Sequence, residues 1–311
     1  MFLRSPMGLC LKYFSKISGI LILNKKYRHL YRDFFDFKSP SNLKHYFVEE
    51  YIPFLSNMFV DVVGKPSDYV FQCWLQGEEN APTIVKKCME SVRHFSKNKK
   101  YVLITAKNWS EWVDLPDFVV KKYNDGKISN AHFADILRLC LLSKYGGYWI
   151  DATCLMTGDF PDWIEQSPFF MFGTDGPFAY TEIQNCFIHS LPHYFLTDAW
   201  KFLMFKYWLR ENEGLNYFFA HFLFCAMVRA NPMARSQFAN MPKVIQTPTH
   251  KMLCVLDEDF DMEKFCEFVR GSFIHKLTYK FKSKQNPQRD GTFFRFITDN
   301  DLDYILKCSP R

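Results

Sequence analysis

A carboxylate at the end of a short aromatic strand is the feature of this sequence best placed to do chemistry. Asp151 follows the run 145–150, in which two glycines separate an apolar helix from a strand. Asp135 and Arg138 lie upstream, three residues apart, so they are neighbours on the helix surface. Each alone could be an ordinary surface charge or turn residue. Because the glycine turn folds the strand against the helix, the three should meet at a common edge and form a ligand site.

The helix that carries Asp135 and Arg138 is predicted over 131–145. Its apolar residues recur at three- and four-residue intervals, at Phe133, Ile136, Leu137, Cys140, Leu141 and Tyr145. Ser129 and Asn130 are candidate N-terminal caps, and Gly146 can adopt a left-handed conformation after the last turn.

Residues 131–153 resemble the signature of the capsular polysaccharide synthesis glycosyltransferases, which are relatives of glycosyltransferase family 32. The shared pattern is Ser-Asp-x-x-Arg, then Tyr-Gly-Gly, then a strand ending in Asp-x-Asp. In this chain Ala134 replaces the serine and Thr153 stands in place of the second aspartate, a version expected in the capsular subgroup. Residues 69–82 resemble the family's first strand and nucleotide loop, and 272–280 resemble its C-terminal Ile-His-Lys-Leu motif.

The resemblance implies a retaining glycosyltransferase. It would move a hexose-type sugar from a nucleotide diphosphate donor, with a UDP-sugar expected, to a growing capsular, lipopolysaccharide or other surface glycan. The acceptor would be a saccharide or a lipid-linked saccharide. Asp135, Arg138 and Asp151 would be the catalytic residues, and Asp135 and Arg138 would also hold donor hydroxyls. The further donor-binding residues implied are Cys73, Trp74, Gln76, Asn185, Lys276 and Lys280.

The departing diphosphate needs its charge stabilised, usually by a divalent cation and basic side chains. Manganese or magnesium prefers oxygen ligands, which suits Asp151. Because Thr153 is uncharged, the cation is expected to be held weakly until the donor adds its own oxygens. The Thr153 hydroxyl, a bridging water or His275 would complete the site. Lys276 and Lys280 would present two ammonium groups to phosphate if their segment were helical.

Strands and helices alternate from residue 69 onward, which predicts an α/β fold with a mainly parallel central sheet flanked by helices. The resemblance makes that fold GT-A-like. Strands are predicted near 69–75, 101–105, 148–151, 169–172 and 184–188, and helices near 82–95, 117–123, 131–145, 194–210 and 217–230. Residues 1–66 are expected to form an N-terminal helical, basic and aromatic segment. Residues 67–311 would be the glycosyltransferase domain, with an added helical lobe at about 194–268.

Composition agrees with one large domain, since the 311 residues are 48 % hydrophobic. The ten cysteines include no Cys-x-x-Cys pair, which favours reduced thiols in a cytoplasmic protein and argues against a zinc site. The net charge of +6 suits an acidic partner such as a sugar nucleotide or phospholipid, and no nucleic-acid-binding motif accompanies it.

The apolar rhythm between residues 9 and 23 suits a basic amphipathic helix. It could pack on the enzyme core, or it could bring residues 1–32 to anionic lipid at the inner face of the cell membrane.

Two other functions are compatible with the same residues. Asp151 and Asp175 could be the carboxylate pair of a glycoside hydrolase. Alternatively, the chain could be a non-catalytic assembly protein at the membrane surface. A transferase requires Asp135, Arg138, Asp151 and His275 to converge around one cleft, whereas an assembly protein does not.

Overall fold

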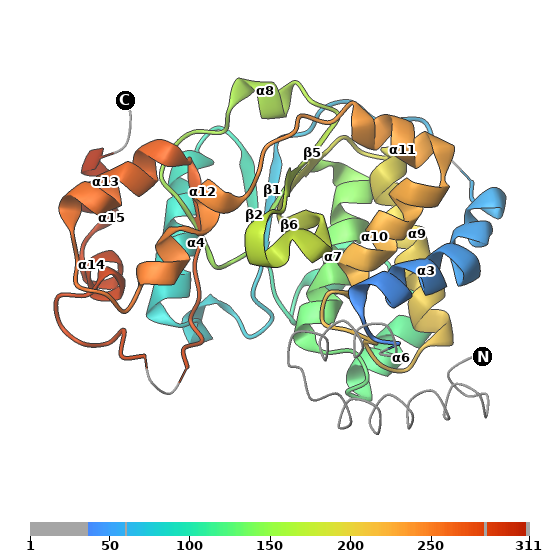
Figure 1. Ribbon diagram of the computed structural model, residues 1–311, viewed down its shortest axis with the longest axis horizontal. Coiled ribbons are helices and arrows are strands. Elements are labelled where there is room, and N and C mark those ends of the chain that lie inside the picture. Colours follow the sequence, from blue (N-terminus) through green and yellow to red (C-terminus); the bar gives the residue numbers. More distant parts are fainter. Residues whose placement is uncertain (1–36, 60, 283–284, 309–311) are drawn as a thin grey trace, which may run out of the picture.

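The computed structural model describes residues 37–59, 61–282 and 285–308, and its centre is a five-stranded sheet of order β2-β1-β3-β6-β5 (Figure 1). Strand β1 (Tyr69–Cys73) pairs in parallel with β2 (Lys100–Ile104) and β3 (Gly147–Ile150). Strand β6 (Ile183–Ser190) is antiparallel to both β3 and β5 (Phe169–Gly173). Four strands therefore share one direction, and the fold is the predicted GT-A-like α/β fold with a mostly parallel sheet.

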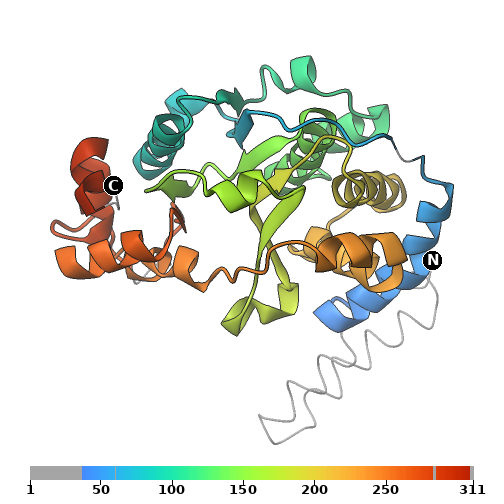
Figure 2. The same ribbon diagram turned by 90° about the horizontal axis from the view of Figure 1, so that it is seen from above.

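Helices cover the sheet and make the crossovers between its parallel strands (Figure 2). Helix α4 (Thr83–Phe95) links β1 to β2, and α6 (Asp117–Asn124) and α7 (Asn130–Tyr145) link β2 to β3. Helix α9 (Phe195–Arg210) packs on α7, and α10 (Phe219–Ala230) packs on α9 and β6. The remaining helices are α3 (Pro40–Glu50), α5 (Trp109–Trp112), α8 (Asp162–Glu165), α11 (Pro232–Ala239), α12 (Thr247–His250), α13 (Met262–Gly271), α14 (Phe293–Asp299) and α15 (Leu302–Ile305). The 3-10 turns are η2 (Ile52–Asn57), η3 (Glu78–Asn80), η4 (Gly176–Thr181), η5 (Met252–Val255) and η6 (Leu306–Cys308).

A second, two-stranded sheet was not predicted from the sequence. It pairs β4 (Cys154–Met156) antiparallel with β7 (Ile274–Lys276). Lys276 therefore ends a strand and Lys280 lies in the loop beyond it. The helical arrangement considered for these two lysines is wrong.

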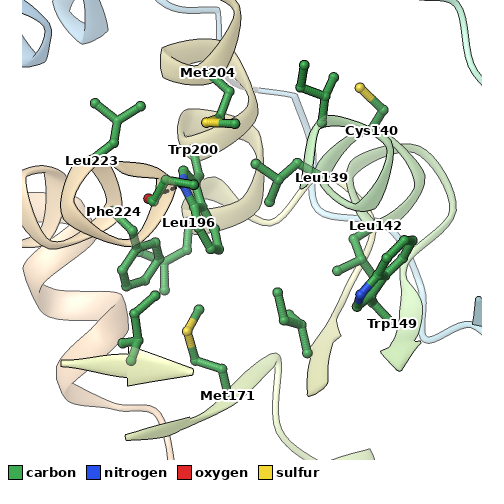
Figure 3. Close-up of a cluster of buried hydrophobic side chains, with 14 of the residues drawn as sticks. Leu139, Cys140, Leu142, Trp149, Met171, Leu196, Trp200, Met204, Leu223 and Phe224 are labelled. Atoms are coloured by element: carbon green, nitrogen blue, oxygen red, sulfur yellow. Dashed lines mark hydrogen bonds between the residues drawn. The ribbon is translucent and has the colours of Figure 1, made fainter. Parts of the chain in front are cut away.

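Two hydrophobic clusters meet beside the end of β3. In the first cluster, Trp149 and Leu142 lie across from the side chains of α9 and α10 (Figure 3). The second cluster joins α4 to α13 and α14. Ile150 belongs to the first cluster and Ala152 to the second, so the residue between them, Asp151, lies at their junction.

The described part of the predicted N-terminal segment and the predicted helical lobe share the hydrophobic clusters of the central sheet. Helix α3 packs on α10 and belongs to the first cluster. The range 194–268 is divided, because α9 to α11 contribute to the first cluster whereas η5 and α13 contribute to the second. The predicted amphipathic helix and the lipid contact of 1–32 lie outside the described residues. No helix in the described part of the chain is both long and apolar enough to cross a bilayer.

The described cysteines depart from expectation at one position. Cys266 is disulfide-bonded. The free thiols among the described residues are Cys73, Cys88, Cys140, Cys154, Cys186, Cys225 and Cys254. The prediction of reduced thiols is therefore correct for this set and wrong for Cys266.

Candidate active site

The Gly146-Gly147 turn sets the angle between α7 and β3. The Ser129 side chain caps α7 by accepting a hydrogen bond from His132 N at 3.3 Å, as predicted. Gly146 and Gly147 have φ of +65° and +85°. A Cβ on Gly147 would lie 2.2 Å from the Tyr69 carbonyl oxygen, so no other residue fits between β1 and β3 there. The turn delivers Asp151 to the carboxyl end of the strand.

The backbone of Asp151 is anchored to both neighbouring strands. Its N–H donates to the Cys186 carbonyl at 2.8 Å, and its carbonyl accepts from Gln72 Nε2 at 3.3 Å. Cys186 belongs to β6 and Gln72 to β1. The carboxylate therefore projects from a position that the sheet itself fixes.

Both oxygens of the Asp151 carboxylate accept hydrogen bonds. Arg138 Nη2 donates to Oδ1 at 3.0 Å, and Trp149 Nε1 donates to the same oxygen at 2.9 Å. Lys276 Nζ donates to Oδ2 at 2.6 Å and to Thr153 Oγ1 at 2.7 Å. Two cationic groups thus flank one carboxylate.

Arg138 joins the Asp151 group to a second carboxylate. Its Nη1 lies 2.9 Å from Asp135 Oδ1, as an ion pair without hydrogen-bond alignment. Asn185 Nδ2 donates to the same Asp135 oxygen at 3.2 Å. The guanidinium lies 4.8 Å from the centre of the Trp149 ring. The predicted meeting of Asp135, Arg138 and Asp151 is found, and Asn185 and Lys276 join it.

The charges of the site are set by burial and by these pairs. Burial would raise the pKa of Asp151, but the Lys276 ammonium and Arg138 guanidinium outweigh it and lower that pKa below its ordinary value. Burial would lower the pKa of Lys276, yet Asp151 raises it above the usual value. Burial raises the pKa of Asp135, and Arg138 only partly offsets this. Asp151 and Lys276 therefore form a stable ion pair.

The four charged side chains of the site differ in their exposure to solvent. Arg138 is 6 % exposed and Asp135 15 %, while Asp151 and Lys276 reach 23 % and 24 %. A ligand arriving from solvent would meet the Asp151–Lys276 pair most directly.

A family model described as capsular polysaccharide synthesis protein matches residues 24–297. The chain belongs to that family. Membership indicates a role in capsule biosynthesis. No curated protein and no solved structure matches the chain.

His275 and Lys276 are adjacent in β7, but their side chains lie in different surroundings. Successive strand residues face opposite ways, so His275 points away from the side on which Lys276 meets Asp151. His275 is fully buried, with Nε2 3.0 Å from Thr157 Oγ1. Burial lowers its pKa to about 3. This geometry gives the predicted role of His275 as a metal ligand no support.

The residues predicted for the nucleotide base lie together at the end of β1. Cys73 and Trp74 are half-buried, and Gln76 is exposed. The Trp74 ring packs edge-on against Tyr279, with centroids 5.3 Å apart. Lys280 is exposed beside them, its Nζ 5.4 Å from the centre of the Tyr279 ring.

A divalent cation fits the Asp151 group poorly. Both Asp151 oxygens and the Thr153 hydroxyl already accept hydrogen bonds, and Lys276 occupies the position between the two residues. A cluster of three possible metal ligands within the described chain, Asp61, His193 and Asp198, lies near the start of α9. The divalent cation therefore stays a prediction. The contacts of Lys276 with Asp151 and Thr153 argue against it.

Two residues that contact Asp151, and one buried histidine within electrostatic range of Arg138, were not identified from the sequence. Trp149 lies two residues before Asp151, and the period-2 rule for strands could have placed both on one face. Gln72 is a fully buried polar residue in β1 whose Oε1 accepts from Tyr101. His221 is buried in α10, and burial followed by the nearby Arg138 charge lowers its pKa to about 3. The sequence gives no signal that brings His221 to this site.

Proposed function

We propose that this chain is a glycosyltransferase that moves a hexose-type sugar from a nucleotide diphosphate to a growing capsular or other surface glycan. The observation that carries the proposal is the convergence of Asp135, Arg138, Asp151, Asn185 and Lys276 at the carboxyl end of β3. In open α/β sheets, ligands bind outside the carboxyl ends of the strands. Family membership supports the same conclusion.

Each half of the group suits one part of a sugar nucleotide. Asp135 forms an ion pair with Arg138, accepts a hydrogen bond from Asn185, and can exchange these contacts for sugar hydroxyls. Arg138 can donate paired hydrogen bonds to vicinal hydroxyls or to phosphate. Lys276, on the more exposed side, can meet the diphosphate. The nucleotide base would then extend toward Trp74 and Tyr279.

Retention of anomeric configuration is part of the proposal and derives from the family resemblance. The mechanism we favour is front-face transfer, in which the departing diphosphate helps to deprotonate the acceptor. The acceptor would be a saccharide or lipid-linked saccharide, met in the cytoplasm or at the inner face of the membrane.

A glycoside hydrolase fits this geometry less well. Such enzymes need one carboxyl group that stays protonated to serve as general acid. Asp151 is paired with two cations that lower its pKa. Asp175, the other candidate, immediately precedes η4 and accepts a hydrogen bond from the Thr247 hydroxyl. A non-catalytic assembly protein would not require the convergence of these residues.

The test is to measure thermal stabilisation of the full chain by a panel of nucleotide sugars and then to follow donor consumption with saccharide acceptors. We expect one donor, with UDP sugars first, to stabilise the chain and to be consumed. NMR of the product reports the anomeric configuration. If no nucleotide sugar binds, or if bound donor is never turned over with any acceptor, the transferase assignment is wrong.

A further inference from the structure

Lys276 stands between the first and third residues of the Asp-Ala-Thr sequence. Its Nζ lies 2.6 Å from Asp151 Oδ2 and 2.7 Å from Thr153 Oγ1. The backbone fixes this position on both sides of the lysine. Lys276 pairs with Cys154 in the two-stranded sheet, and Leu277 N donates to the Thr153 carbonyl at 2.8 Å.

The lysine keeps one donor for a ligand. An ammonium group has three N–H donors and no acceptor. Asp151 and Thr153 each accept from one of the three donors of Lys276. The side chain is 24 % exposed, so the third donor can reach a ligand oxygen.

The charges of the group balance without an added cation. Asp135 and Asp151 supply two negative charges, and Arg138 and Lys276 supply two positive ones. An aspartate at position 153 would add a further negative charge, which a divalent cation could offset. Thr153 removes that charge, and its hydroxyl instead accepts a hydrogen bond from Lys276.

We propose that the Lys276 ammonium supplies the positive charge that a divalent cation would otherwise supply to the diphosphate at this site. Donor binding and sugar transfer would then proceed without a metal. This inference rests on the proposed function. In the transfer, the bond from sugar C1 to the diphosphate oxygen breaks, and its electron pair stays on that oxygen. The acceptor hydroxyl oxygen forms the new bond to C1, and its proton passes to the departing diphosphate. Lys276 stabilises the new charge by hydrogen bonding and keeps its own protons.

The primary experiment uses the unmodified chain. UDP binding is measured by calorimetry in excess EDTA and again with manganese, and donor turnover is measured in both conditions. We expect affinity and turnover to agree within about three-fold, since the stabilising charge belongs to the protein. Binding or turnover with manganese alone overturns the inference while leaving the transferase proposal intact. If neither UDP nor any other nucleotide or nucleotide sugar of the donor panel binds in either condition, both proposals are wrong.

Two variants sharpen the test. Lys276→Gln should lower turnover by at least ~100-fold, on the scale of removing one stabiliser of developing charge. The matched control is Lys264→Gln, which removes a surface lysine paired with Glu258 at 2.8 Å and should leave turnover within about two-fold. Equal turnover in the two variants contradicts the role of Lys276.

The second variant, Thr153→Asp combined with Lys276→Ala, supplies the missing carboxylate and removes the ammonium. We expect its UDP binding to depend on manganese. UDP affinity as insensitive to EDTA as that of the unmodified chain would contradict the proposed exchange of lysine for cation.

Discussion

The Trp149 indole N–H donates to Asp151 Oδ1 at 2.9 Å, from two residues earlier on the same strand. Trp149 is only 1 % exposed, so its ring also belongs to the hydrophobic core. The face of that ring supports the Arg138 guanidinium at 4.8 Å. One buried side chain therefore orients both the carboxylate and the cation of the site.

Trp149→Phe should separate the hydrogen bond from the packing. Phenylalanine keeps an aromatic ring in the core but removes the indole donor, so Asp151 loses one hydrogen bond that fixes its direction. We expect turnover to fall by about ten-fold, corresponding to about 1.4 kcal/mol of lost positioning. Steady-state kinetics measures the change. The control is Trp163→Phe at the surface, and a similar fall there would show that the effect is general destabilisation.

Arg138→Ala should abolish turnover while free UDP still binds. Under the proposed function the hydrogen bonds that this variant removes are those to the sugar hydroxyls, because Arg138 is paired with both Asp135 and Asp151. Binding of UDP and of the UDP-sugar is compared by calorimetry. Equal loss of affinity for both ligands would indicate a purely structural ion pair.

The same variant should also unfold more easily. The Arg138 side chain is 6 % exposed, and its removal leaves Asp135 and Asp151, which are 15 % and 23 % exposed, without their shared partner. We expect a loss of about 3–5 kcal/mol in the free energy of unfolding, measured by urea denaturation. Binding is therefore compared at a temperature where the variant is folded.

Asp151→Asn tests the charge that the two cations surround. The amide keeps the size of the side chain but cannot balance Arg138 and Lys276, and its NH2 group would oppose one of them. We expect turnover to fall at least ~100-fold. Turnover within a few-fold of the unmodified chain would remove Asp151 from the mechanism.

The local sequence predicted most of the fold because its signals are short-range. The apolar spacing and Ser129 cap defined α7, and the glycine pair defined the turn into β3. These features also brought Asp135, Arg138 and Asp151 together, since they depend on only one helix and one strand.

The contacts that the sequence missed are long-range. Lys276 reaches Asp151 across 125 positions through a strand of only three residues, which carries little periodic signal. The choice between His275 and Lys276 depended on which way each faces in β7, and this is fixed only by pairing with β4. His221 lies within electrostatic range of Arg138 through the packing of α10, which no local pattern specifies.

The stability of the fold should fall steeply as the pH decreases from about 6.5. Burial lowers the pKa of His189 to about 4, and that of His221 and His275 to about 3. Below pH 6.5 the unfolded chain binds protons at these positions whereas the folded chain does not. The stability they contribute is therefore complete above pH 6.5 and is lost toward their folded pKa values. Each histidine accounts for about 1.4 kcal/mol per pH unit.

Urea denaturation at several pH values between 7 and 5 measures this slope. His275→Gln should reduce the dependence of the unfolding free energy on pH by the contribution of about one proton. The glutamine amide can still hydrogen-bond to Thr157. The control is His45→Gln, which replaces a histidine that is 74 % exposed. An unchanged slope in His275→Gln would contradict the neutral, buried state of this histidine.

Trp74 provides the test of the base site. Its ring is half-buried, packs against Tyr279, and carries an indole N–H that lacks a hydrogen-bond partner in the described part of the chain. If a nucleotide base stacks there, Trp74→Ala should weaken UDP binding by about 10-fold or more, since stacking of one base on an aromatic side chain contributes about 1–3 kcal/mol. Trp163→Ala removes an exposed tryptophan and should leave UDP affinity unchanged. Calorimetry with UDP and with inorganic diphosphate then separates base from phosphate binding. An equal loss for both ligands, or no loss for UDP, would mean that Trp74 packs the core and does not contact the base.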